Sequence, residues 1–151
     1  MVRQLKLVIL AMFLGTLSLM AGSWGSTWSS SFQRTHKIVI HVDSKDAATQ
    51  KIVLKNVTNL VKSYGEDHIK VEVVAYGPGL SLLIEGKANA DTVRAMAQKD
   101  YIRFSACNNT IQKITNETGT APDLIDGVVV VPSGAARIVD LEEDGYIYLK
   151  P

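Results

Sequence analysis

The chain has 151 residues, of which 46% are hydrophobic and 21% charged, and this suits one globular domain with its own core. Lys and Arg total 16 against 15 Asp and Glu, so the basic excess that binds a nucleic-acid backbone or an anionic membrane is absent. The single cysteine, Cys107, excludes an internal disulfide and a zinc site built from several cysteines. We therefore expect one domain, with no nucleic acid among its partners.

The segment 1–22 has the pattern of a signal peptide. Arg3 and Lys6 form a short basic region, an apolar run follows at 7–20, and small residues beginning at Ala21 suit signal peptidase. The run has about 14 residues, fewer than the roughly 20 that span a bilayer core. We expect this segment to be removed and the protein to be exported to the periplasm, with retention as a membrane anchor as the alternative.

The first elements after the signal segment are predicted from composition and periodicity. Residues 23–35 are rich in serine and glycine, so we expect a flexible leader before a domain at 36–151. The run 37–43 is short and β-branched, as expected of a strand buried in a parallel sheet. Apolar residues then recur at helical spacing over 46–64, and Gly65 follows as a stop, so this segment predicts a helix.

A second strand is predicted at 69–76, and the turn Gly77-Pro78-Gly79 ends it. The glycines of this turn would let a ligand or a neighbouring subunit approach the backbone closely. The elements that follow in the chain are a short helix near 80–85, a helix at 89–99 and a third strand at 101–106.

Directly after Cys107, the segment 108–117 has Ile111 and Ile114 on one side and is followed by Gly119, which predicts a helix. The remaining elements are a fourth strand at 126–131, a helix at 132–143 and a last strand at 146–149. Strands that alternate with helices predict an α/β, three-layer sandwich around a five-stranded, mainly parallel sheet.

The carboxyl ends of these strands define the predicted site, because reactive groups and ligands gather there in open parallel sheets. This edge includes the segment 132–134 and Cys107, which lies where a strand gives way to a helix. Helix N-terminal amides and the helix dipole favour a thiolate, so we predict a nucleophilic, partly exposed thiol, with a buried core cysteine as the alternative. The supporting residues expected around it are Asn108, Asn109, Thr110, His41, Asp43, Gly77 and Gly79.

His41 and the glycine-containing turns are the remaining candidates for chemistry. His41 stands two residues before Asp43 and is a supporting candidate, with a core or interface histidine as the alternative. The turns at 77–79 and 133–134 are too short to specify phosphate binding, and no dinucleotide or nucleotide-binding motif is present in the sequence. We therefore expect neither a cofactor nor a metal ion.

The segment around Cys107 resembles a known family. Residues 104–110, FSACNNT, are similar to the F-x-A-C-x-N-T signature of the DsrE/DsrF-like proteins, a sulfur-relay group that includes persulfide carriers. Ile111 stands where that signature usually has Met. Further similar segments are HVD at 41–43, AYGPG at 75–79, VVPSG at 130–134 and GYIYLKP at 145–151, so the resemblance covers 37–151.

This resemblance implies a flavodoxin-like fold, assembly into a homo-oligomer (trimer or hexamer) and a cysteine able to carry sulfur. The resulting hypothesis is an exported sulfur-handling protein: the Cys107 thiolate accepts a sulfane sulfur as a persulfide and passes it to another thiol, while Asn109 and Thr110 stabilise the anion. A protein or a small sulfane-sulfur compound would be donor or acceptor. The alternative is a non-catalytic oligomeric module that binds a small ligand or a partner and uses Cys107 for packing.

Overall fold

The described part of the chain, residues 34–151 of the computed structural model, is built around a five-stranded sheet in the order β4-β3-β2-β1-β5. Every pair of neighbouring strands is parallel. The strands are β1 (His36–Val42), β2 (Ile69–Ala75), β3 (Ile102–Cys107), β4 (Val129–Val131) and β5 (Ile147–Leu149). The predicted signal segment and nearly all of the predicted leader lie outside the described residues.

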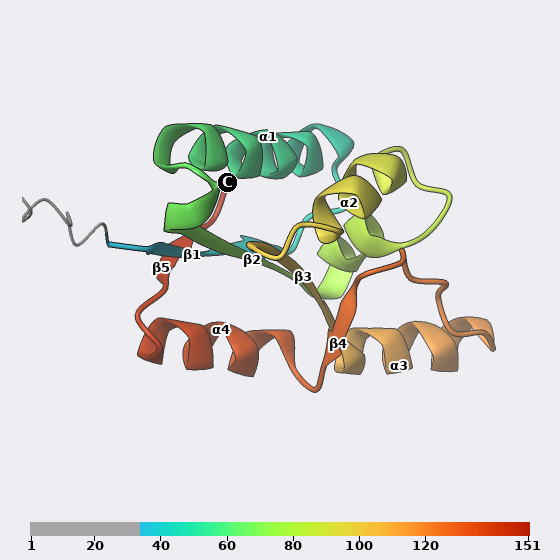
Figure 1. Ribbon diagram of the computed structural model, residues 1–151. Coiled ribbons are helices and arrows are strands. Elements are labelled where there is room, and N and C mark those ends of the chain that lie inside the picture. Colours follow the sequence, from blue (N-terminus) through green and yellow to red (C-terminus); the bar gives the residue numbers. More distant parts are fainter. Residues whose placement is uncertain (1–33) are drawn as a thin grey trace, which may run out of the picture. The chain divides into compact units, whose positions relative to one another are not determined.

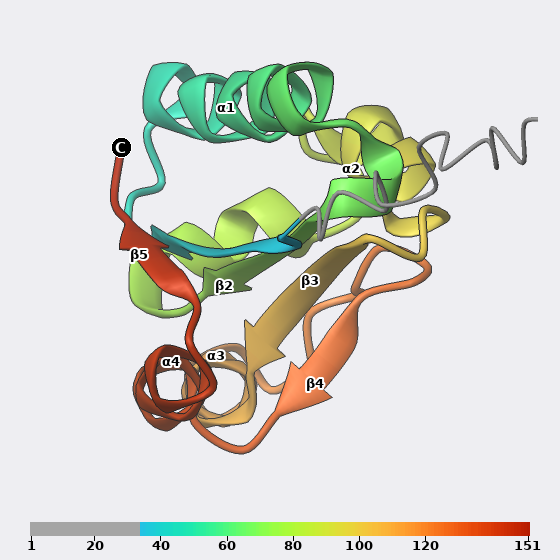
Figure 2. The same ribbon diagram turned by 60° about the vertical axis from the view of Figure 1, so that its left-hand side comes forward.

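Helices cover both faces of the sheet. One face carries α1 (Ala47–Tyr64) and α2 (Ala90–Ala97), and the other carries α3 (Asn108–Thr118) and α4 (Gly134–Glu143), as Figures 1 and 2 show. Two short 3-10 helices, η1 (Glu66–His68) and η2 (Gly77–Leu83), precede and follow β2. These three layers confirm the predicted flavodoxin-like α/β sandwich. No helix within residues 34–151 is both long and apolar enough to cross a membrane.

Most predicted elements are confirmed to within one or two residues, and two differ for a local reason. The fourth strand begins at Val129 instead of Asp126, because Asp126 and Gly127 form a turn in which Gly127 has a φ of 85°. This is the left-handed region, which glycine adopts without steric cost. The short helix predicted at 80–85 is the 3-10 helix η2, which already begins at Gly77.

Capping residues fix the ends of the helices on both faces. Asp46 caps α1 by accepting a hydrogen bond from the Thr49 N–H at 2.7 Å, and Gly65 ends the helix. Ser133 caps α4 by accepting from the Ala136 N–H at 3.4 Å. This cap places the first turn of α4 directly after β4, at the carboxyl edge of the sheet.

The two faces of the sheet differ in chemistry, because successive side chains of a strand point to opposite faces. The face under α1 and α2 is apolar and includes Ile40, Val73 and Phe104, all fully buried. On the other face, α4 contributes Ile138 and Leu141 to a much smaller apolar cluster. The strands also bury His41, Glu72 and Ser105 on the α4 face. The polar chemistry of the sheet is therefore concentrated under α4.

An ion pair ties α4 to the centre of the sheet. The Arg137 guanidinium donates two hydrogen bonds to the Glu72 carboxylate, at 2.8 and 2.7 Å, and the Ser105 hydroxyl donates a third at 2.6 Å. The Glu72 side chain is only 3% exposed. Burial alone would raise the pKa of Glu72, but the hydrogen bonds from Arg137 and Ser105 outweigh it and hold the pKa below its usual range.

We predict that Arg137→Met lowers the free energy of unfolding by about 3 kcal/mol at pH 7, because the buried Glu72 carboxylate loses its bidentate partner. The matched control is Arg94→Met. Arg94 also pairs with two carboxylates, those of Glu85 and Asp91, but at the surface, so its loss should cost about 1 kcal/mol or less. Urea unfolding measures both values.

The same ion pair gives the expected pH dependence. Because the folded pKa of Glu72 is depressed, its contribution is complete above the unfolded pKa of about 4.3 and is lost as the pH falls through the folded pKa. The stability gap between wild type and Arg137→Met should therefore shrink in acid. Equal losses for the Arg137 and Arg94 variants at pH 7 would show that the buried pair has no special role.

Candidate functional site

Cys107 is the last residue of β3, and α3 begins at the next residue, as the sequence predicts. Its side chain points to the α4 face, like that of Ser105 two residues earlier. Cys107 is buried, with 5% of its surface exposed. The expectation of a partly exposed thiol is therefore wrong, because the first turns of α3 and α4 close around the end of the strand.

Two helix N-termini meet at the Cys107 sulfur. Figure 1 shows α3 and α4 end to end below the sheet, with their N-terminal ends toward each other. The backbone N–H groups of Gly134 from α4 and of Asn109 and Thr110 from α3 are directed at the sulfur. The Cys107 side chain makes no capping hydrogen bond to α3, so the Asn109 and Thr110 N–H groups act on the thiolate chiefly as oriented dipoles.

The pKa of Cys107 reflects two opposed effects. Burial raises it, because a thiolate loses solvation in the protein interior. The Gly134, Thr110 and Asn109 N–H groups and the Thr110 hydroxyl lower it, and their sum prevails, so the pKa of Cys107 lies below its usual value. A thiolate is the nucleophilic form of cysteine, so the site favours nucleophilic chemistry at sulfur.

Thr110 connects α3 to the loop after β2. Its hydroxyl oxygen accepts a hydrogen bond from the Gly77 N–H at 2.8 Å. The hydroxyl keeps its own proton in this bond, and it is one of the groups that lower the pKa of Cys107. Gly77 has a φ of 53°, which a residue with a side chain rarely adopts. The structure thus brings together two of the predicted supporting residues, Gly77 and Thr110.

Gly79 is buried and faces its own chain. A Cβ at this position would lie 2.1 Å from the Val42 carbonyl oxygen at the end of β1. The close backbone approach that the sequence predicts therefore exists, but β1 makes it and not a ligand or a neighbouring subunit. Gly79 positions the η2 loop against the sheet edge.

The side chains of Asn108 and Asn109 make no hydrogen bond among the residues that the structure describes. Asn109 is exposed and Asn108 half-buried, so both stand at the surface of the first turn of α3. The contribution of Asn109 to the thiolate comes from its backbone N–H. Any residue other than proline supplies that group, so the Asn109 side chain stays available to solvent or a ligand.

Tyr76, which sequence reasoning did not single out, holds the start of α4 in place. A Cβ at Gly134 would lie 2.8 Å from the Tyr76 Cδ1 atom, so only glycine fits there without a shift of the ring. Tyr76 also contacts His41, because the two rings stack with their centroids 4.6 Å apart. Tyr76 therefore lies between His41 and the helix end that faces Cys107. The sequence signal that could have identified Tyr76 is its position directly after β2.

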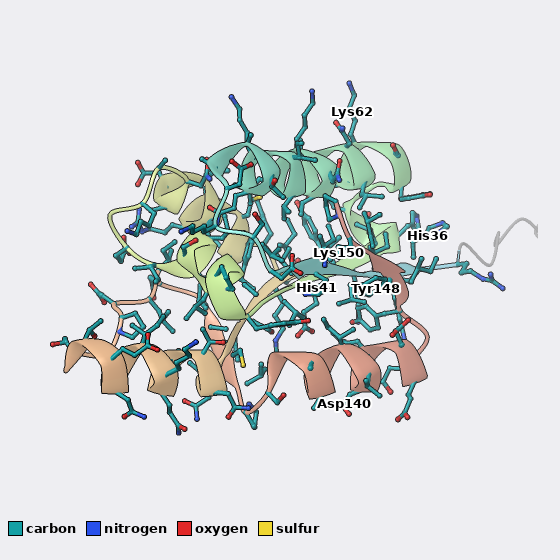
Figure 3. All side chains as sticks on the ribbon, turned by 180° about the vertical axis from the view of Figure 1, so that it is seen from behind. His36, His41, Lys62, Asp140, Tyr148 and Lys150 are labelled. Carbon is teal, nitrogen blue, oxygen red and sulfur yellow. The ribbon has the colours of Figure 1, made fainter. Side chains whose placement is uncertain are left out.

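His41 belongs to a polar cluster at the ends of β1 and β5. Its Nδ1 atom shares a hydrogen bond of 2.7 Å with the Tyr148 hydroxyl, and Lys150 pairs with Asp43 at 2.5 Å. Figure 3 shows His41, Tyr148 and Lys150 side by side. Sequence reasoning predicted His41 and Asp43 but missed Tyr148 and Lys150, because the last strand lies next to the first only in the folded sheet.

The surroundings of His41 lower its pKa and so favour its neutral form. Burial lowers its pKa, and the Lys150 cation works in the same direction against the opposing Asp43 carboxylate. The His41 Nε2 atom lies 4.0 Å from Asp43 Oδ2 and has no hydrogen-bond partner among the described residues. Burial likewise raises the pKa of Tyr76, so its phenol stays protonated. His41 and Tyr76 thus form a neutral stack beside the thiolate site.

The described residues offer a metal ion no ligand set, since no three His, Cys, Asp or Glu side chains within 34–151 lie together. What the arrangement provides is one cysteine with a lowered pKa, surrounded by hydrogen-bond donors. Such a thiolate can attack a disulfide, a persulfide or another electrophilic sulfur.

Comparison with known proteins identifies a related solved structure. No family model matches the chain, and no curated protein matches it. A solved structure described as a protein of unknown function, MTH1491 from Methanobacterium thermoautotrophicum, has a TM-score of 0.68 and 30% sequence identity. The match covers 77% of this chain and 99% of MTH1491. The chain therefore belongs to the same protein family as MTH1491.

Proposed function

We propose that this is an exported sulfur-handling protein in which Cys107 carries a sulfane sulfur as a persulfide and passes it to a second thiol. The observation that carries the proposal is the position of Cys107 between the N-termini of α3 and α4, which lower the pKa of its thiol despite burial. The resemblance of residues 104–110 to the DsrE/DsrF-like signature supports it, and membership of that group is part of the proposal.

The transfer needs no external oxidant or reductant, because the sulfane sulfur only moves from one thiolate to another. The Cys107 thiolate donates its electron pair to the outer sulfur of a persulfide or polysulfide donor. That S–S bond breaks, and the shortened donor leaves as an anion. Transfer onward repeats the step with an acceptor thiolate as the nucleophile. Cys107 then returns to its thiolate form, so one residue suffices for both half-reactions.

The surrounding residues suit the thiolate that accepts the sulfur. Gly134, Asn109 and Thr110 lower the pKa of the Cys107 thiol and so favour its nucleophilic form. The Tyr76 ring packs on Gly134 and keeps this donor in place. Burial of Cys107 limits the access of water and large oxidants to the thiolate.

The second candidate function is a non-catalytic oligomeric module that binds a small ligand or a partner. The 5% exposure of Cys107 favours it, because free cysteine is among the residue types most often buried for packing alone. The two functions differ in what Cys107→Ser should do. Loss of sulfur loading with an intact fold supports the carrier, whereas loss of stability supports packing.

We predict that incubation of the native protein with inorganic polysulfide adds about 32 Da, one sulfur atom, to its intact mass. Because the chain has one cysteine, Cys107→Ser should abolish the gain and leave the circular dichroism spectrum and unfolding midpoint nearly unchanged. Dithiothreitol should remove the added sulfur. An inert native thiol, or a Ser variant that mainly unfolds, would leave the binding module as the function.

We predict that iodoacetamide alkylates Cys107 with an apparent pKa below that of an ordinary cysteine thiol and that Thr110→Val raises this pKa. The variant removes the hydroxyl that accepts from Gly77 and lowers the pKa of Cys107. The control is Thr115→Val, because the Thr115 hydroxyl donates to the Ile111 carbonyl within α3. A pH profile that Thr110→Val leaves unchanged would rule out the hydroxyl as a donor.

We also propose that the protein is a homo-oligomer, a trimer or a hexamer. The edge strand β4 exposes 39% of Val129 and 48% of Val130, and α4 exposes 54% of Val139. An apolar edge strand is a template for pairing with another chain. The edge strand β4 pairs with β3, and Val131 is the register partner of Cys107 in the sheet.

Light scattering at micromolar concentration should therefore give three or six times the mass of one chain. Val130→Lys should reduce this mass, because a charge on an edge strand opposes pairing. The equally exposed Ile52 lies on α1, and Ile52→Lys should leave the mass unchanged. A monomeric wild-type protein contradicts the proposal.

A further inference from the structure

We infer that the groove between η2 and α3 holds the body of the sulfur donor, and that this donor is the persulfide of a small cysteine-containing peptide of the glutathione type. The inference rests on the proposed function of Cys107. It adds the class of substrate. It also gives a binding role to residues other than those that surround the Cys107 sulfur, above all Lys113 and Glu117.

The groove has the size and lining of a small-molecule site. Its volume is about 470 Å³, within the range of roughly 300–1,000 Å³ that is usual for ligand pockets. Pro78 and Ile84 from the η2 side and Ile114 from α3 form its apolar part. Such a surface suits the methylene groups of an organic donor and offers little to an inorganic polysulfide dianion.

One end of the groove lies at Thr110, in the first turn of the helix that follows Cys107. Thr110 and Gly77, joined by their hydrogen bond, both line the groove. The same Thr110 hydroxyl is one of the groups that lower the pKa of Cys107. The exposed side chain of Asn109 lies beside them. A ligand in the groove therefore has its inner end at the residues that stabilise the thiolate.

The other end of the groove carries a cation and an anion. Lys113 and Glu117 lie one turn apart on α3, with Nζ and Oε1 separated by 3.8 Å. Their side chains are 73% and 61% exposed, so the pair is weak and each member can exchange its partner for a ligand group. A peptide has a carboxylate for Lys113 and an ammonium for Glu117, whereas a polysulfide has no group for Glu117.

The length of α3 selects a short peptide over a single amino acid. Measured from Thr110 at about 1.5 Å per residue, Lys113 and Glu117 lie roughly 4.5 and 10.5 Å farther along the helix. A tripeptide spans about 10 Å when extended, so with its sulfur near Thr110 it reaches as far as Glu117. A single amino acid spans about 3.5 Å and does not reach Glu117.

The burial of Cys107 also favours a small donor over a protein. With 5% of Cys107 exposed, a folded partner would have to insert a projecting cysteine between η2 and α3. In the proposed step the Cys107 thiolate attacks the outer sulfur of the peptide persulfide. The peptide S–S bond breaks, and the peptide thiolate leaves from the groove with the electron pair, so the sulfur is transferred without a further reactant.

Binding is tested apart from chemistry in the Cys107→Ser variant, which cannot react, with reduced glutathione as the probe. We expect amide NMR shifts in residues 77–84 and 109–117, and a dissociation constant that rises about tenfold when Lys113→Ala and Glu117→Ala are added. The control is Lys62→Ala, an exposed lysine on α1 outside the groove, which should have no effect.

Loading is tested in the chain with its native cysteine. The double change Lys113→Ala and Glu117→Ala should lower the rate of Cys107 loading by glutathione persulfide about tenfold and leave loading by inorganic polysulfide unchanged. If polysulfide loads Cys107 but the loading rates of the double variant with both donors equal those of wild type, the groove inference is wrong and the sulfur-carrier function stands. If neither donor loads Cys107, the carrier function and the assigned donor role both fail, even where glutathione binds.

Discussion

Parallel pairing of the strands is the constraint on which the site depends. In a parallel sheet all carboxyl ends lie at one edge, and each connecting helix that starts there presents free N–H groups to it. Because β3 and β4 are neighbours, the helices that follow them, α3 and α4, begin beside each other. Cys107 ends β3 between these two helix starts. Its donors therefore follow from strand order, with no dedicated binding loop.

The ion pair under α4 fixes the first turn of the same helix, which contributes the Gly134 N–H to the Cys107 site. Arg137 lies one turn after Gly134, so its bidentate contact with Glu72 fixes the start of α4 relative to β2. From the sheet edge, Tyr76 packs on Gly134 and fixes the same turn. A buried ion pair contributes little net stability against an apolar alternative, but it specifies one position for the helix. That position aims the Gly134 N–H at sulfur.

Sequence reasoning predicted the elements and most of the sheet-edge neighbourhood, because both depend on local patterns. Hydrophobic periodicity and glycine stops locate helices, and strand ends in a parallel sheet converge whatever the strand order. What it missed depends on contacts between distant segments: Arg137 meets Glu72 across 65 positions, and Tyr148 meets His41 across 107. The burial of Cys107 was missed for the same reason, since α4, from another part of the chain, covers it.

Burial and reactivity at Cys107 are compatible once the geometry of a persulfide is considered. The added sulfur lies about 2.05 Å beyond the cysteine sulfur, so the atom that reacts in the second half-reaction stands farther out than the one that reacts in the first. The inner sulfur keeps the Gly134 and Thr110 donors. Under the proposed function, a 5% exposed thiolate would accept sulfur only from a slender donor, whereas the loaded form would present its outer sulfur to a wider range of acceptors. Selectivity then lies in loading, the step that the groove beside Thr110 would govern.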